Sequence, residues 1–304
     1  MDAKSPGTDA RPSDVWLSLL VPAYEYPEGI VRILDLLAAS NKDGVECLVG
    51  DDSASDAVEV AVRDHPLHSS GRIHYLRNTP ARGAVHNWNL LLSRACGEFV
   101  LFMHHDECPE LRTFFASLRA TTLAQPAPDH VVLNCLLPTR FGRLRSHMPR
   151  WARRFLFRFW PSHLLVHNSV GPPSAWVARR CLAPPFRTDL KWLVDVEWYF
   201  RMLRASGYAR VSMPEISVLS IPQPGISITA GLAGQTADLR TSEARLIEAD
   251  LGKLPALRLL LPISPVERVV SRLEALAWHI FRAALRLAGE AQRRAWPDWM
   301  KAGR

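Results

Sequence analysis

The sequence predicts an α/β protein with a mainly parallel central sheet flanked by helices. Short apolar runs alternate with segments of helical periodicity from Trp16 onward. Tight polar turns separate the two kinds of segment, a pattern typical of parallel sheets that are covered on both faces. The chain has 304 residues, 48% of them apolar, which is enough to build a substantial core.

The first hundred residues hold the clearest alternation. We expect buried strands over 17–21, 45–49, 73–76 and 99–103, with Pro22 ending the first of them. Apolar residues at helical spacing predict helices around 30–37, 56–64 and 85–96, and Ser55 is a candidate N-cap for the second helix.

Beyond Pro109 the pattern predicts a helix over 111–123, a strand over 131–137, a helix over 195–203 and an extended segment over 211–221. The stretch 140–158 contains seven arginines and no acidic residue, with aromatic residues between them. It could contact anionic lipid or a phosphate of the substrate, or form a solvated face.

Composition restricts the class of protein. A net charge of +7 is compatible with nucleic acid, an anionic membrane surface or a phosphorylated substrate as partner. The five cysteines are scattered without C-x-x-C spacing, which argues against a disulfide framework or a zinc site and favours the cytoplasm. No signal peptide is apparent, and no run reaches the roughly 18 apolar residues that span a bilayer.

Polar residues cluster where three predicted strands end, at Pro22–Tyr24, Asp51–Asp52 and His104–Glu107. Ligands of parallel sheets bind outside the carboxyl ends of the strands. We therefore expect one site at this edge, although each cluster by itself could be a solvated loop.

These residues resemble family 2 glycosyltransferases. Leu17–Tyr24, ending in Pro-Ala-Tyr, and Val49–Asp56, with Asp-Asp-Ser-Ala-Ser-Asp, are similar to the opening of that family. Gly83–Asn89 and Ala95–Val100 are similar to its Gly…Asn…Ala-x-Gly-Glu-Tyr segment. The resemblance covers residues 15–210 and implies a GT-A fold, a nucleotide-sugar donor and inversion at the anomeric carbon. With the composition of the two ends, it suggests a flexible tail over 1–14, a glycosyltransferase domain over 15–225 and a basic, helical extension over 226–304.

The resemblance implies a donor site at the ends of these strands. Asp52 would accept a hydrogen bond from N3–H of uracil or thymine, which favours a UDP- or dTDP-sugar. The ring of Tyr24 would pack on the base, or else pack in the core. The expected donor-binding residues are Pro22, Ala23, Tyr24, Glu25, Asp51, Asp52, Arg82, Asn87 and His105.

His104-His105-Asp106 occupies the place of the family's Asp-x-Asp metal motif and resembles a subgroup with histidine there. A divalent cation at this position would neutralise the diphosphate leaving group. Asp106 matches the metal-binding position of the motif. His104 is either a second ligand, which favours Mn²⁺ over Mg²⁺, or a neutral hydrogen-bond donor to phosphate. Many relatives add a histidine to the site later in the chain, where this sequence offers only Gln223.

Asp195 matches the family's general base, which takes the proton of the acceptor hydroxyl. Its apolar neighbours would raise its pKa by desolvation. The alternative is that Asp195 caps the helix that begins at Val196, and Glu197 is a rival carboxylate. We expect Ser174, Glu197 and Trp198 to line the acceptor pocket.

The acceptor is expected to be a saccharide or a lipid-linked molecule. Apolar residues over 266–284, with arginines on the opposite face, predict a helix that lies on an anionic membrane or on the domain itself, and Trp278, Trp296 and Trp299 are candidate interface anchors. Nucleic acid is not expected, because no recognition motif accompanies the basic runs.

Two other functions compete with an active glycosyltransferase. A dinucleotide-binding oxidoreductase would carry G-x-G-x-x-G after the first strand, which this sequence lacks. A catalytically weak or inactive relative that binds a nucleotide sugar is favoured by His104 and by the missing histidine.

Overall fold

The structure is a computed structural model, which describes residues 15–40, 43–139, 143–207, 210–221, 232 and 234–252, together with the isolated positions 276, 279–280, 283–284 and 294–295. The predicted tail over 1–14, Gln223 and most of the predicted extension over 226–304, including Trp278, Trp296 and Trp299, lie outside the described residues.

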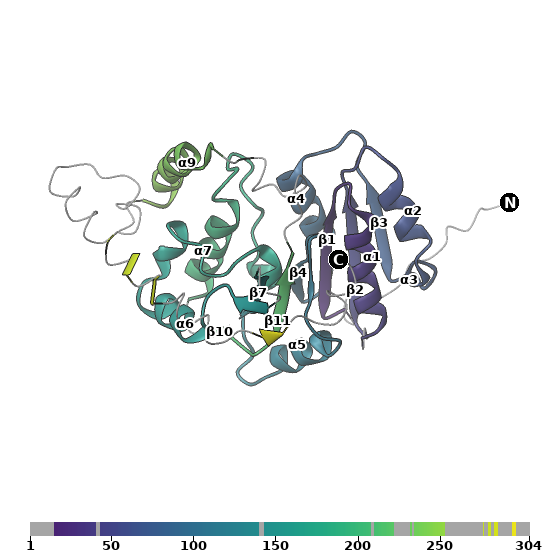
Figure 1. Cartoon of the computed structure of the whole chain (residues 1–304), viewed down its shortest axis with the longest axis horizontal. Coiled ribbons are helices and arrows are strands. Elements are labelled where there is room, and N and C mark those ends of the chain that lie inside the picture. The colour runs from purple at the N-terminus through teal and green to yellow at the C-terminus, as the bar shows by residue number, and fades with distance from the viewer. Residues whose placement is uncertain are drawn as a thin grey trace.

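Four neighbouring parallel strands form one side of the larger sheet, and three of them are buried along their whole length (Figure 1). They are β1 (Leu17–Ala23), β2 (Val45–Asp51), β3 (Ile73–Arg77) and β4 (Phe99–Phe102). The sheet continues through β9 (Trp176–Arg179), β6 (His130–Val132) and β10 (Val211–Ser212), so the order among the described strands is β10-β6-β9-β4-β1-β2-β3. Only β9 runs antiparallel to its neighbours within this described sheet. The predicted α/β class with a mainly parallel sheet is confirmed.

The helices of the first half cover this sheet. They are α1 (Pro27–Ala38), α2 (Ala57–Arg63), α3 (Pro66–Ser69), α4 (Ala84–Arg94) and α5 (Phe114–Thr122). Ile30, Ile33, Leu34 and Leu37 form the buried stripe of α1, as their helical spacing predicts. Both α1 and α4 pack against β1, which buries that strand on both faces.

Two predicted boundaries are wrong. Strand β1 continues past Pro22 to Ala23, because its pairing with β4 ends at Leu20 and only β2 flanks the proline. Ser55 is not the N-cap of α2: that residue is Asp56, and the Ser55 hydroxyl donates instead to Glu25.

The single strand predicted over 131–137 is two strands in two sheets. Strand β6 belongs to the larger sheet, whereas β7 (Asn134–Pro138) belongs to a second sheet, and Leu133 separates them. Leu133 N donates to Ala175 O and Asn134 N to Ile216 O, so the backbone changes partner at this point. An unbroken apolar run gives no sign of such a change.

The second sheet has the order β12-β8-β7-β11-β5 among the described strands. Its other members are β5 (Glu107–Pro109), β8 (Arg143–Ser146), β11 (Ser217–Ser220) and β12 (Arg294–Ala295). Strand β5 begins in the polar turn that follows β4, so this turn lies where the two sheets meet.

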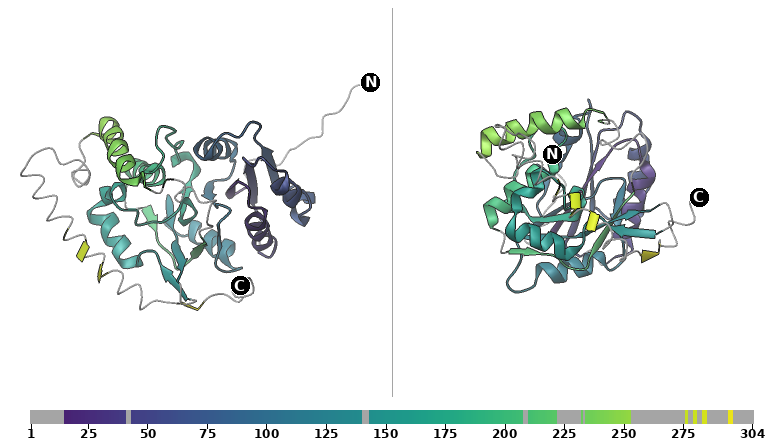
Figure 2. Two further views of the ribbon diagram at one scale, coloured as in Figure 1. Left: turned by 45° about the horizontal axis from the view of Figure 1, so that its top comes forward. Right: turned by 60° about the vertical axis from the view of Figure 1, so that its left-hand side comes forward.

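The second half of the chain adds α6 (Arg150–Phe159), α7 (Val194–Ser206) and α9 (Thr236–Leu251), with short 3₁₀ turns η1 (Pro161–Leu165), η2 (Pro173–Ala175) and η3 (Arg180–Leu182). Aromatic rings bind α7 to the core: Tyr199 stacks on Trp176 at 4.8 Å and Trp198 on Phe186 at 4.3 Å between ring centroids. Figure 2 shows α9 lying along the outside of this half. No helix among the described residues is long and apolar enough to cross a lipid bilayer.

Candidate active site

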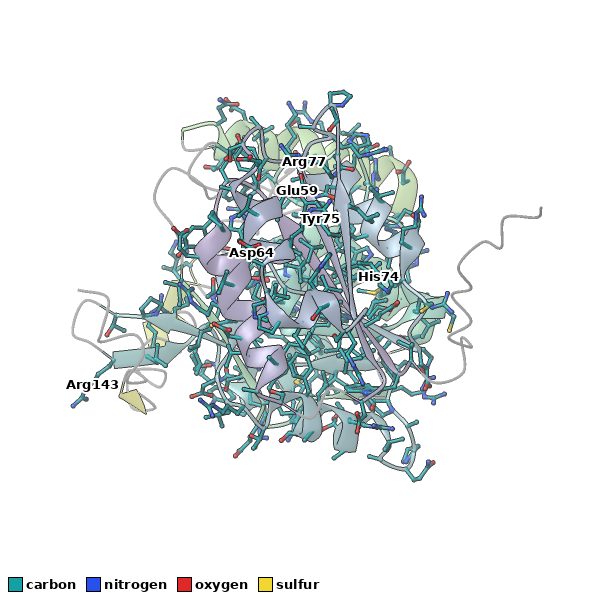
Figure 3. All side chains as sticks on the ribbon, turned by 90° about the vertical axis from the view of Figure 1, so that its right-hand side faces the viewer. Glu59, Asp64, His74, Tyr75, Arg77 and Arg143 are labelled. Atoms are coloured by element: carbon teal, nitrogen blue, oxygen red, sulfur yellow. The ribbon has the colours of Figure 1, made fainter. Side chains whose placement is uncertain are left out.

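The loop after β2 is held by a fully buried carboxylate, that of Asp51. Its Oδ1 accepts from Ser53 N at 2.9 Å, and its Oδ2 accepts from the Tyr75 hydroxyl at 2.6 Å. Burial and the hydrogen bond to Asp51 raise the pKa of Tyr75 above its ordinary value. Figure 3 shows Tyr75 and Arg77 of β3 beside Glu59 of α2, and Arg77 pairs with Glu59 at 3.3 Å. The Asp51 side chain therefore shapes the loop, and its predicted place in the donor site stays a prediction.

Asp52 stands at the end of β2 in a network of amides. Its Oδ1 accepts from Asn78 Nδ2 at 2.7 Å and from Arg82 N at 3.1 Å. Asn78 also donates to Asn87 Oδ1, and Asn87 Nδ2 donates to Gly50 O at 2.7 Å. Both hydrogen bonds to Asp52 use one oxygen, so Oδ2 is the one left to accept from a ligand. Asn87 is buried with both ends of its amide engaged, and it connects α4 to β2.

The loop after β1 is tied to the loop after β2 by Glu25. Its carboxylate accepts from Ala54 N at 2.6 Å and from the Ser55 hydroxyl at 2.6 Å, and this hydrogen bond to Ser55 lowers its pKa. Its own N–H donates to Ser53 Oγ at 2.7 Å. Glu25 thus holds the two loops together. Next to it, the side chain of Tyr24 is 50% exposed, which excludes core packing and leaves a ring face for a ligand. Pro22 and Ala23 are buried beneath it.

The turn His104–Glu107, here called the metal turn, contains four titratable side chains at the end of β4. His104 Nδ1 lies 3.1 Å from Glu107 Oε2, and the imidazole packs on the ring of Trp88 at 5.0 Å between centroids. His104 Nε2 is buried and has no hydrogen-bond partner in the described part of the chain. Burial acts to lower the pKa of His104, but the charge and hydrogen bond of Glu107 outweigh it and raise that pKa.

The other two side chains of the metal turn are also perturbed. Burial, followed by the charge of Glu107, raises the pKa of Asp106 to about 6. Burial and the neighbouring His104 lower the pKa of His105 to about 4, so His105 is neutral at pH 7. His105 lies edge-on to Tyr26, with 5.8 Å between centroids, and Gly29 of α1 packs on its carbonyl: a Cβ there would lie 1.9 Å from that oxygen.

Asp195 is the second residue of α7. Leu193 is the N-cap, so Asp195 does not cap the helix. Its Oδ1 accepts from Val196 N at 2.8 Å and its Oδ2 from Asn168 Nδ2 at 2.8 Å. Burial raises the pKa of Asp195 to about 6, against the hydrogen bond from Val196. The charges of His104 and Glu107 also act on this carboxylate, so the start of α7 lies close to the metal turn.

The structure brings three of the predicted positions together. Asp106 and Asp195 both interact with the charge of His104. Asp52 is connected to them through two adjacent residues of α4, because Asn87 joins its network and Trp88 packs on His104. The three carboxylates therefore surround one end of α4 at the carboxyl edge of the parallel strands.

The three residues expected in the acceptor pocket are fully buried instead. Ser174 lies in η2 without exposed surface. The indole N–H of Trp198 donates to Pro184 O at 2.6 Å, within the aromatic core. Glu197 Oε1 lies 2.6 Å from Arg201 Nε, and burial raises its pKa. On a helix, residues 195 and 197 point in different directions, so Glu197 faces the core and is not placed to act as a base.

Three residues that support the site were not predicted. Glu107 orients His104, and Asn168 orients Asp195. Glu243 of α9 is buried, and its carboxylate accepts from the backbone N–H groups of Lys191, Trp192 and Leu193 at 2.7 to 3.1 Å. Glu107 adjoins the motif, and its spacing of three residues from His104 could have indicated the contact. Nothing local connects residue 243 with residue 195.

The residues of the metal turn fit a divalent cation only in part. Asp106 offers a carboxylate and His104 an unpartnered ring nitrogen, whereas no group of three His, Cys, Asp or Glu side chains in the described chain is placed to hold a metal ion. A bound molecule is one source of further ligands. A cation shared with the diphosphate of a nucleotide would gain ligands in this way.

Comparison with known proteins gives a consistent picture. The family described as Glycosyl transferase family 2 matches residues 18–161, a little under half of the chain. A curated relative, Uncharacterized protein MT1568 of Mycobacterium tuberculosis, is 29% identical over 222 residues, and the match spans 64% of each chain.

Solved glycosyltransferases share the fold. Staphylococcus aureus TarS in complex with UDP-GlcNAc is similar with a TM-score of 0.59 and 18% identity, over 81% of this chain and 70% of that one. The Pyrobaculum calidifontis mannosyltransferase PcManGT, with GDP-Man and Mn²⁺, is similar with a TM-score of 0.52 and 18% identity, over 90% of this chain and 88% of that one. Glucosyl-3-phosphoglycerate synthase of M. tuberculosis, with Mn²⁺, UDP and phosphoglyceric acid, is similar with a TM-score of 0.51 and 18% identity, over 78% of each chain. The chain therefore has the GT-A fold of these enzymes.

Proposed function

We propose that this chain is a family 2 glycosyltransferase that moves a sugar from a nucleotide-sugar donor to an acceptor hydroxyl with inversion. The observation that carries the proposal is Asp195. It is a partly buried carboxylate whose pKa is raised to about 6, it is oriented by Asn168, and it lies within electrostatic reach of the metal turn. The family match and the nucleotides bound by proteins of the same fold support it.

The donor's base binds between the first two strand ends. Asp52 Oδ2 accepts a hydrogen bond from the N3–H of a pyrimidine base, while Asn78 and Arg82 N hold the other oxygen. The half-exposed ring of Tyr24 supplies a packing face for the base. A UDP- or dTDP-sugar suits this arrangement, and two of the three solved structures above bind UDP or UDP-GlcNAc.

The donor diphosphate brings a divalent cation to the metal turn. Asp106 and His104 Nε2 would hold it, because Glu107 accepts from Nδ1–H and leaves a lone pair on Nε2. An imidazole ligand favours Mn²⁺ over Mg²⁺, and two of the structures above contain Mn²⁺. When bound, the cation neutralises the charge that develops on the leaving diphosphate.

Asp195 acts on the acceptor. Its carboxylate takes the proton of the acceptor hydroxyl as that oxygen forms a bond to the anomeric carbon. The bond from the anomeric carbon to the diphosphate oxygen breaks on the opposite face, and the pair of electrons leaves with the nucleotide. Asn168 holds Asp195 Oδ2 and, through its own Oδ1, the N–H groups of Val170 and Gly171, so it keeps the loop and the carboxylate in one arrangement.

A binding protein without catalysis is the second candidate. It is favoured by the lack, within the described residues, of a third protein ligand for a metal. Such a protein would bind the nucleotide sugar at Asp52 and Tyr24 without turning it over. Asp195 would then have no use for its raised pKa.

Thermal unfolding with a panel of nucleotide sugars tests the donor and the cation together. We expect a UDP- or dTDP-sugar to raise the unfolding temperature, with a larger rise when Mn²⁺ is present, because a ligand of the folded state stabilises it more as its concentration exceeds its Kd. Chelation with EDTA should remove the additional rise. A rise that does not depend on Mn²⁺ would contradict the cation part of the proposal, and no rise with any nucleotide would contradict the donor part. Release of free nucleotide over time separates an enzyme from a binding protein.

Asp52→Asn tests the proposed hydrogen bond between Asp52 and the pyrimidine of the donor. The amide keeps an oxygen for Asn78 but presents N–H to the N3–H of the pyrimidine, so we expect donor affinity to fall by about 10- to 100-fold with a smaller change in kcat. Asp56→Asn, which replaces the exposed N-cap of α2 by an equally good cap, is the matched control. Equal donor KM values in both variants would rule out the assigned contact.

A further inference from the structure

The exposed face of α6 carries two parallel rows of side chains. Trp151, Phe155 and Phe159 follow one another at intervals of four residues, and Arg150, Arg154 and Arg158 repeat the same interval one position earlier. Residues four apart lie on one side of a helix, so one half of the exposed face is aromatic and the adjoining half is cationic. The opposite face holds the helix on the protein through Ala152, Arg153, Leu156 and Phe157, which are buried.

The aromatic row is not part of a core. The three side chains are 56%, 53% and 69% exposed. The described residues include four exposed large aromatic side chains. Three of them form this row, and the fourth is Tyr24 of the proposed donor site. Phe155 packs on Phe159 at 5.0 Å between ring centroids, and the Arg158 guanidinium lies 5.8 Å from the centre of the Phe159 ring. Leaving such a row in water is unfavourable, which indicates a partner for this surface.

The charge around the row identifies the partner as anionic. No acidic residue occurs between positions 140 and 158. Arg143 and Arg145 of β8 precede the helix in the chain and are exposed, and Figure 3 shows Arg143 projecting away from the body of the protein. One arginine of the row, Arg150, pairs with an acid, Glu215, at 2.8 Å. Arg154 Nη2 lies 3.5 Å from Met213 O, a neutral carbonyl, and no acidic side chain among the described residues pairs with this guanidinium.

We propose that α6 docks this protein onto an anionic lipid surface, with Trp151, Phe155 and Phe159 entering the headgroup region and the arginines contacting lipid phosphates. A helix that lies in the interface has this composition: aromatic side chains on one side, arginines beside them, and low overall hydrophobicity. Long arginine side chains can reach the headgroups from the flank of the aromatic row. A nucleic acid would also satisfy the charge, but the rings of Phe155 and Phe159 pack on each other rather than standing apart as platforms for separate bases.

Docking through α6 would serve the proposed function, because of where the helix lies. The docking proposal itself does not depend on that function. Only η1 separates α6 from the loop that carries Asn168, and Asn168 orients Asp195. A helix on the membrane therefore places the acceptor side of the site next to lipid. A lipid-linked acceptor is the substrate class that this arrangement suits.

Sedimentation of the full chain with vesicles tests the proposal. We expect binding to phosphatidylcholine vesicles that contain phosphatidylglycerol, little binding to phosphatidylcholine alone, and weaker binding at high salt. The triple variant Trp151→Ser/Phe155→Ser/Phe159→Ser should lose about tenfold or more in affinity. The variant Arg154→Gln/Arg158→Gln should lose about fivefold for each arginine on anionic vesicles.

Matched controls use other exposed positions. Val60→Ser/Leu111→Ser/Leu123→Ser removes three apolar side chains of similar exposure, and Arg63→Gln/Arg94→Gln removes two arginines from α2 and α4. Both controls should bind vesicles as the wild type does, and all variants should keep the unfolding temperature of the wild type within a few degrees. Fluorescence quenching by brominated lipid should be stronger for the wild type than for Trp151→Phe, which reports contact of this side chain with the bilayer.

Three results would overturn the proposal. The first is no binding of the wild type to anionic vesicles. The second is equal binding by the wild type and by the aromatic triple variant. The third is a dimer of the wild type in solution that the triple variant abolishes without any change in vesicle binding, since the row would then be an interface between two copies.

Discussion

Asp195→Asn is expected to lower kcat for sugar transfer by about a hundred- to ten-thousand-fold, the usual contribution of a general base. The amide has nearly the same shape but cannot take the acceptor's proton. Donor binding, measured as the rise in unfolding temperature with a nucleotide sugar, should change little, because the assigned donor contacts are at Asp52 and Tyr24. A variant that retains wild-type turnover would show that another group is the base.

Glu197→Gln is the matched control for this experiment. It removes a fully buried carboxylate from the same helix, two residues further on. Because Glu197 pairs with Arg201 inside the protein, its loss should lower the unfolding temperature while kcat stays within a few-fold of the wild type. Opposite outcomes at 195 and 197 would separate loss of chemistry from loss of packing.

The pH dependence of the same residue provides an independent check. Asp195 is active when ionised, so kcat should rise as the pH passes through about 6 and reach a plateau above it. Stability should move in the other direction. Folding raises the pKa of this carboxyl from its ordinary 3.8, so the folded protein binds the extra proton, and the Asp195 contribution to the free energy of unfolding falls between pH 3.8 and about 6. Asp195→Asn should remove both effects.

Glu243→Ala is the second substitution with a large expected effect. It leaves three backbone N–H groups at the start of α7 without their acceptor, and a hydrogen bond to a charged group contributes about 1.5–3 kcal/mol. We expect the free energy of unfolding to fall by about 2–4 kcal/mol and kcat to fall about tenfold or more, because Asp195 follows two residues after Leu193. Urea unfolding and steady-state kinetics measure the two effects.

Two further variants of α9 sharpen that prediction. Glu243→Gln keeps one acceptor oxygen and should lie between the wild type and the alanine variant in both measurements. Glu248→Ala, on the same helix and with a partly exposed side chain, should leave both unchanged. If Glu243→Ala lowers stability while kcat is unaffected at a temperature where it remains folded, Glu243 supports the fold and does not position the base.

The sequence predicts the strands and helices of the first half well because each is marked locally. Buried runs such as 45–49 are too short for helices, and the stripe of α1 repeats at helical spacing. The change of sheet at Leu133 could not be predicted, because it depends on which strand the backbone meets, and that partner, Ile216, lies far along the chain.

The same distinction applies to the site. Motif positions predict that Asp52, Asp106 and Asp195 belong together, since they stand at strand ends or at a helix start. Motif position does not say whether a side chain faces a ligand or the interior. The side chains of Asp51, Asn87, Ser174 and Trp198 are examples, because each of them is buried, and three of the four make hydrogen bonds inside the protein. Asn168 and Glu243 act through contacts made only in the folded chain.

Gly29 affects the candidate site although it belongs to none of the motifs that predict the site. At Gly29 the backbone of α1 packs directly against the His105 carbonyl. Any other residue at this position would push α1 and that carbonyl apart. Helix α1 packs on β1 and therefore limits how far the metal turn can move toward it. A larger side chain at position 29 would push the His105 carbonyl away from α1 and displace the metal turn, so a helix that supplies none of the proposed ligand contacts can still alter the site.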